Sequence, residues 1–202
     1  MEACIEEKLK LFAPDKYCLV NAGDSVRLNE KSKDGKASIE CTCQEETLVF
    51  PTPERNVLPY LDETIKGARA CADKFLFTAN EDGWDLHVIE LKKTIGTDTF
   101  AKSKNQFRMG IYNGRALAGF MGMKLKEIHL HSAFRSDRIH SISPGNLAAM
   151  RAQNNWEIQK IIEEWNADQC TLSVDLEERT YTLGKIKLDE LGQGEIVLYR
   201  KV

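Results

Sequence analysis

The sequence lacks the features of secreted and membrane proteins. No apolar run approaches the length of a membrane-spanning helix, and the first ten residues, MEACIEEKLK, are acidic and too polar for a signal peptide. We therefore expect a cytoplasmic protein that has no membrane partner.

The sequence also lacks the spacings of common cysteine and phosphate-binding motifs. Its six cysteines include one CxC but no CxxC, and no histidine lies at zinc-finger spacing from them. The glycines of "GFMGMK" (119–124) do not have the spacing of a P-loop. We expect reduced thiols, as in cytosolic proteins, and no nucleotide site of the P-loop type.

The composition is that of a globular protein with its own core. Of 202 residues, 42% are hydrophobic and 29% are charged. The predicted elements are, in chain order, a helix within 1–12, strands near 17–20, 24–28, 37–43 and 46–50, a helix or strand near 58–68, strands at 75–79 and 85–93, a helix at 98–120, a strand at 126–134, a helix at 143–165 and three strands within 170–202. This order predicts a β-rich N-terminal extension at 1–55 and an α/β domain at 56–202.

Charge is distributed unevenly along the chain. The net charge is only −3, but residues 91–140 hold ten Lys and Arg against three Asp and Glu, a balance of +7. A basic segment of this kind is typical of proteins that bind phosphate-rich ligands, and it is equally typical of a solvated surface.

The basic segment follows directly on the stretch "DGWDLHVIELKKT" (82–94). Side chains alternate across a strand, so Leu86, Val88, Glu90 and Lys92 share one face and His87 lies on the other. Both faces begin apolar, which indicates a central strand that is covered on both sides. A carboxylate and an ammonium at the end of such a strand must be partnered, exposed or functional.

A third charged residue is placed by the turn between the two predicted strands. If the loop is Asp82–Gly83, the two residue numbers of each cross-strand pair sum to 165, and Asp73 lies across from Lys92. If the turn spans Asn80–Gly83, the sum is 163 and Asp73 faces Glu90. Under either register, two carboxylates and one lysine converge at one end of the hairpin.

This group of three has a chemical use. Two carboxylates at a strand edge can hold Mg²⁺, which polarises a phosphate oxygen and lowers the pKa of a bound water. A lysine on the same face, about 7 Å along the strand from the Glu, can orient that water or stabilise developing charge. The structural alternative is an ion pair at an exposed strand end, which contributes little to stability.

The arrangement Asp73–(x)16–Glu90-x-Lys92 on a hairpin resembles the PD-(D/E)xK phosphodiesterase superfamily, which has the restriction-endonuclease-like fold. The resemblance covers residues 56–134. It implies a central mixed sheet with helices on both faces, an α-β-β-β-α-β core, and cleavage of nucleic acid, DNA more than RNA, with Mg²⁺ or Mn²⁺. Asp73 and Glu90 would be metal ligands and Lys92 would assist the water.

The resemblance implies further site residues. Gln106, on the helix after Glu90-x-Lys92, matches a glutamine found in several branches, and Glu63 matches an additional acidic ligand of some members. Two positions depart from the pattern, because Ala72 replaces the proline and Gly110 lies where one branch has a tyrosine. Members of this fold include prokaryotic defence nucleases, homodimers and non-catalytic binding modules.

Two further groups of residues are candidates for binding. Five basic side chains of the segment are predicted to follow phosphates: Lys93, Lys102, Lys104, Arg108 and Arg115. His129 and His131 share a strand face, as metal ligands do, but without a third ligand a polar strand face is the favoured interpretation. His87 is predicted to be a hydrogen-bonded core histidine.

Overall fold

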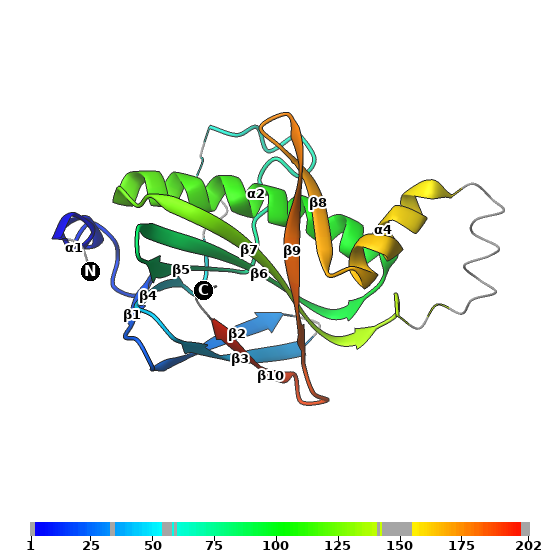
Figure 1. Cartoon of the computed structure of the whole chain (residues 1–202), viewed down its shortest axis with the longest axis horizontal. Coiled ribbons are helices and arrows are strands. Elements are labelled where there is room, and N and C mark those ends of the chain that lie inside the picture. Colours follow the sequence, from blue (N-terminus) through cyan, green and yellow to red (C-terminus); the bar gives the residue numbers. More distant parts are fainter. Residues whose placement is uncertain are drawn as a thin grey trace.

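The computed structural model describes residues 3–32, 35–53, 58, 60–140, 142 and 155–198. Within these ranges there are three helices and ten strands (Figure 1). The helices are α1 (Ala3–Leu9), α2 (Thr97–Met121) and α4 (Trp156–Asn166). The strands are β1 (Cys18–Val20), β2 (Ser25–Ser32), β3 (Gly35–Cys43), β4 (Thr47–Phe50), β5 (Lys74–Asn80), β6 (Gly83–Ile95), β7 (Leu125–Asp137), β8 (Gln169–Val174), β9 (Glu177–Lys187) and β10 (Gln193–Leu198).

Seven strands form a large mixed sheet in the order β1-β4-β5-β6-β7-β9-β8. The run β1, β4, β5 and β6 is antiparallel, whereas β6, β7 and β9 are mutually parallel. Parallel neighbours need a crossover connection, and α2 supplies it between β6 and β7. The predicted α/β fold with a central mixed sheet is therefore confirmed.

Helix α2 packs closely on β6 because two of its residues have no side chain. A Cβ at Gly110 would lie 2.8 Å from Val88 Cγ1, and one at Gly114 would lie 2.5 Å from Leu86 Cδ2. Both glycines therefore set the distance between α2 and the sheet. The helix covers the face of β6 that carries Glu90.

The two faces of the large sheet are covered differently. Residues of α1, α2 and α4 pack on one face in a single apolar core. The other face packs against a second, three-stranded sheet of order β10-β3-β2, through residues such as Leu28 and Ile39. The prediction of helices on both faces is thus wrong for the described residues. On this face, the alternating apolar side chains of β2 and β3 pack against the large sheet, at the place where the resemblance implies a helix.

Strands on either side of residue 55 pair in both sheets. In the large sheet β4 pairs with β5, and in the small sheet β10, near the C-terminus, pairs with β3. The long β9 leads directly into β10 and so links the two sheets (Figure 1). The described part of residues 1–55 contains β1 to β4, and these strands are built into both layers of the molecule.

The segment before β5 differs from its prediction. Residues 60–70 form successive turns, such as Ala68 N–H to Ile65 O, and neither the predicted helix nor the alternative strand is present in them. Gly67 has a φ of +84°, which interrupts a right-handed helix.

In helix α4, Trp165 is buried but Trp156 is exposed, so only Trp165 belongs to the core. The predicted part of this helix at 143–154 lies outside the described residues.

None of the helices in the described part of the chain has the length and apolar character needed to cross a bilayer.

Candidate active site at the start of the β5–β6 hairpin

Asp73 lies immediately before β5, close to Glu90 of β6. Lys74 pairs with Ile89 and Asn80 with Gly83, so paired positions sum to 163. Asp73 departs from this ladder by one residue, because its N–H donates at 3.1 Å to the O of Ile89, which the ladder pairs with Lys74. Its carboxylate oxygen Oδ2 also accepts a hydrogen bond from the N–H of Leu91 at 2.7 Å. The Asp73 side chain is thus fixed against the residue that follows Glu90, and the 163 register is confirmed.

Glu90 and Lys92 form an ion pair on the α2 face of β6. The Lys92 ammonium contacts Glu90 Oε1. Glu90 is completely buried, whereas the Lys92 side chain is 22% exposed. The site therefore reaches the surface at its lysine. Glu90 Oε2 is buried and has no hydrogen-bond partner among the described residues.

Gln106 lies beside the ion pair, on α2. Its amide donates a long hydrogen bond to Cys71 O, at 3.5 Å, and its proximity to Glu90 helps to lower the pKa of that carboxyl group. The structure thus brings Asp73, Glu90, Lys92 and Gln106 together. Their catalytic roles stay predictions.

Burial disfavours the charged forms of both carboxyl groups. Burial, reinforced by the neighbouring Asp73 carboxylate, raises the pKa of Glu90 to about 8, against the pull of Lys92. Burial also raises the pKa of Asp73, opposed by the Leu91 N–H and Lys92. A divalent cation between the two groups would favour both carboxylates and so reverse these shifts.

The donor set fits a hard cation that keeps most of its water. Among the described residues there is no group of three or more His, Cys, Asp or Glu side chains able to hold a metal. Mg²⁺ is commonly held by only one or two carboxylates, with waters and substrate phosphates completing its shell. Asp73 and Glu90 supply two carboxylates, and the unpartnered Glu90 Oε2 is a free ligand atom.

Glu63, the other predicted metal ligand, is not brought into this group. Its side chain is 74% exposed and forms an ion pair with Arg69 at 2.6 Å. Glu63 also does not appear among the groups that shift the pKa of Asp73 or Glu90. The structure therefore gives no support to Glu63 as a ligand.

The five predicted phosphate-binding side chains fall into two sets. Lys93 and Lys102 are exposed. The other three have protein partners: Lys104 pairs with Glu164 at 2.7 Å, Arg115 with Asp175 at 2.7 Å, and Arg108 donates to Asn105 at 2.7 Å. The exposed lysines are therefore the better candidates for contact with a phosphate backbone.

Sequence reasoning missed a charged pair next to the site. Lys74, one residue after Asp73, is 1% exposed and pairs at 2.9 Å with Glu30 of β2. Both ions also act on the pKa of Asp73, with Glu30 raising it and Lys74 lowering it. A buried lysine inside an apolar strand was a usable signal, but its partner lies 44 residues away.

Three histidines that the sequence analysis considered separately lie together in the structure. On the face opposite Glu90, His87 Nδ1 lies 3.1 Å from His131 Nε2, and its ring stacks on His129 at 4.7 Å between centroids. His87 is buried and hydrogen-bonded, as predicted. The parallel pairing of β6 with β7 makes these neighbours, because it aligns His87 with His129.

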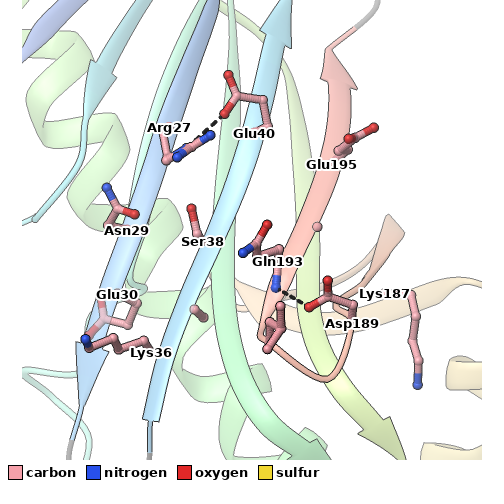
Figure 2. A pocket seen from close by; sticks show the side chains of 13 residues that line it. Arg27, Asn29, Glu30, Lys36, Ser38, Glu40, Lys187, Asp189, Gln193 and Glu195 are labelled. Atoms are coloured by element: carbon pink, nitrogen blue, oxygen red, sulfur yellow. Dashed lines mark hydrogen bonds and ion pairs between the residues drawn. The ribbon is translucent and has the colours of Figure 1, made fainter.

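A hollow of about 790 Å³ lies on the outer face of the small sheet (Figure 2). Its lining mixes both signs of charge. Arg27 pairs with Glu40 at 3.1 Å, and Asp189 accepts a hydrogen bond from the Gln193 N–H at 2.8 Å. Side chains that already satisfy one another make a poor site for an anionic backbone, so we place the candidate site at the hairpin.

Comparison of the chain with family models, curated proteins and solved structures finds no match in any of the three. The functional assignment therefore rests on the geometry of the site.

Proposed function

We propose that this protein is a metal-dependent nuclease that hydrolyses phosphodiester bonds, in DNA more than in RNA. The observation that carries the proposal is the grouping of three charged residues at the start of the hairpin. Asp73 is bound to the Leu91 N–H and lies close enough to Glu90 to raise its pKa, and Lys92 pairs with Glu90. A structural ion pair with Lys92 needs only one carboxylate, whereas the second carboxylate adds a ligand for a metal.

The order of elements around the hairpin supports the same assignment. The consecutive run β4, β5, β6, α2 and β7 matches the β-β-β-α-β part of the restriction-endonuclease-like core. The helix that begins that core has no counterpart at 60–72, where the chain forms turns. The proposal therefore depends on the site more than on the complete fold.

Each residue has a distinct task in the proposed reaction. A bound Mg²⁺ or Mn²⁺ would polarise the phosphate and activate a water molecule. Asp73 and Glu90 would hold the cation, with Asp73 fixed by the Leu91 N–H. Lys92, which is partly exposed, would orient the attacking water or stabilise charge on the phosphate. Gln106 favours the charged form of the Glu90 carboxyl, which burial opposes.

A second candidate is a non-catalytic module that binds nucleic acid or protein. One observation favours it: Lys92 is already paired with Glu90, as it would be in a purely structural role. In that case Lys93 and Lys102 would bind an anionic partner, and no divalent cation would be needed. A homodimer stays an expectation under both proposals.

A cleavage assay decides between the two. The wild-type protein, Glu90→Gln and Lys92→Ala would be incubated with single- and double-stranded DNA and RNA, in Mg²⁺, Mn²⁺ or EDTA. We expect metal-dependent cleavage that falls at least about 100-fold in both variants. Glu6→Gln is the control, because Glu6 and Lys8 repeat the ExK spacing within α1. A folded wild-type protein that cleaves none of these substrates would favour the binding module.

A further inference from the structure

Glu90 belongs to a polar row that crosses three strands of the large sheet. Glu90 of β6 pairs with Ser132 of β7, and Ser132 pairs with Lys185 of β9. Because neighbouring strands are only about 4.8 Å apart, residues aligned in this way have side chains within reach of one another on the same face.

The adjacent row on this face is entirely apolar. It consists of Phe75, Val88, Leu130 and Leu183, which pair in sequence and are all at most 1% exposed. Ser132 follows Leu130 by two residues and is equally buried. A valine would suit such a central position, so the serine needs another explanation than packing.

The Ser132 hydroxyl is an unsatisfied group. Its Oγ is buried and has no hydrogen-bond partner among the described residues. Leaving a buried hydroxyl unpaired destabilises the folded protein. Lys185, its neighbour on β9, is committed elsewhere, since its ammonium pairs with Asp168 at 2.7 Å and donates to Trp165 O at 2.5 Å.

The other unpartnered atom of the row is Glu90 Oε2. Two unsatisfied polar atoms on paired residues of neighbouring strands are the partners that a bridging water requires. The first carboxylate oxygen, Oε1, is taken by Lys92. A water between Ser132 and Glu90 would therefore lie on the side of the carboxylate that Lys92 does not contact.

We propose that Ser132 is a positioning residue of the metal site, and this inference rests on the nuclease proposal. Its hydroxyl holds a water molecule of the cation's hydration shell beside Glu90 Oε2. Mg²⁺ and Mn²⁺ sites with few carboxylates keep several waters, and the groups that hold those waters contribute to affinity. Ser132 thus completes a site to which the protein contributes only two carboxylates.

Direct titration of Mn²⁺ into the full-length protein, by calorimetry and without nucleic acid, tests this role. The variants are Ser132→Ala, the pair Ser132→Thr and Ser132→Val, and Glu90→Gln. Thr and Val have nearly the same shape, but only Thr keeps a hydroxyl. Ser103→Ala is the matched control, because this buried serine of α2 already donates to Thr99 O at 3.1 Å. Thermal unfolding without metal is recorded for each.

We expect Ser132→Ala and Ser132→Val to bind Mn²⁺ about tenfold more weakly than wild type. Ser132→Thr and Ser103→Ala should stay within about threefold of wild type, a margin far inside that tenfold loss. The metal-free unfolding temperature of Ser132→Ala should equal or exceed that of wild type, because an unsatisfied hydroxyl is removed. A serine with a merely structural role would not weaken metal binding while leaving stability intact.

The controls separate this inference from the proposal beneath it. If wild type binds Mn²⁺, Glu90→Gln does not, and Ser132→Ala and Ser132→Val bind as wild type, the role of Ser132 is refuted and the metal site stands. If Val and Thr weaken binding equally, the hydroxyl is irrelevant and the inference again fails. If folded wild type binds no Mn²⁺, the metal site and the role of Ser132 fall together.

Discussion

Asp73 accepts a hydrogen bond from the backbone N–H of Leu91 at 2.7 Å, across the hairpin and one residue beyond Glu90. This bond fixes one carboxylate oxygen against the neighbouring strand. The same residue lies close enough to Glu90 to raise the pKa of that carboxyl group. Asp73 therefore has a structural contact and a proposed catalytic role, and two substitutions can separate them.

Asp73→Asn keeps an oxygen that accepts from the Leu91 N–H but removes the charge. We expect metal-dependent cleavage to fall at least about 100-fold, with the free energy of unfolding unchanged or higher, since burial already disfavours the carboxylate. Asp73→Ala loses the acceptor too and should cost about 1 kcal/mol more in urea unfolding. Equal stabilities for the two variants would contradict the role of the hydrogen bond.

The buried pair of Lys74 and Glu30 predicts an asymmetric effect on stability. Lys74 is 1% exposed and Glu30 about one-third exposed. Glu30→Gln leaves an ammonium buried without its carboxylate and should cost about 3 kcal/mol. Lys74→Met should cost less, because Glu30 can then be hydrated. Urea unfolding measures both, with Glu40→Gln as control, since its exposed pair with Arg27 should contribute less than about 1 kcal/mol. A larger cost for Lys74→Met would show that this account is wrong.

The sequence predicted well what depends on local spacing. The strands of the hairpin and the long helix after it follow from alternating and helical apolar patterns, and α2 spans 97–121 where 98–120 was predicted. One of the two registers considered at the turn holds from Lys74 to Asn80. Asp73 lies just before that ladder and close to Glu90. The grouping of Asp73, Glu90 and Lys92 could thus be predicted from local pattern, and the chemistry of this group stays a prediction.

What the sequence did not reveal depends on contacts between distant segments. Alternation shows that β3 has a buried face but not that β10 pairs with it in parallel, about 155 residues later, to cover the large sheet. Lys104 and Arg115 carry the same charge as Lys102, yet each has a carboxylate partner 60 residues away. Pattern alone cannot distinguish a paired basic side chain from a free one.

This difference among the basic residues gives a prediction about nucleic-acid binding. Lys93→Ala and Lys102→Ala should each lower affinity for a labelled DNA duplex and reduce the slope of log K against log salt by about 0.9. Lys104→Ala should leave that slope unchanged and lower stability, because Glu164 is only 7% exposed. Fluorescence anisotropy between 50 and 200 mM salt, about the range over which such contacts are screened, measures the slopes. Identical slopes for all three variants would exclude the assignment.

The three stacked histidines on the other face of the sheet predict an acid-sensitive fold. Burial, with the neighbouring imidazole of His129, lowers the pKa of His131 from 6.5 to about 3, and burial also lowers that of His87. Between pH 3 and 6.5 the unfolded chain therefore binds more protons at His131 than the folded protein does. Stability from this group is complete above pH 6.5 and is lost as the pH falls, by up to about 1.4 kcal/mol per pH unit.

Urea unfolding at intervals between about pH 5 and 7, where the unfolded histidine titrates, measures this dependence. His131→Gln cannot titrate, so its free energy of unfolding should fall less steeply with acidification than that of wild type. His140→Gln is the matched control, because His140 is exposed.

Glu90 contributes to the pH dependence of stability in the opposite sense. Because its pKa is about 8 in the folded protein, its contribution makes stability fall as the pH rises from 4.5. The comparison must therefore be made between variants that all retain Glu90, in EDTA. If His131→Gln and wild type lose stability at the same rate below pH 6.5, the histidine stack does not carry the acid sensitivity.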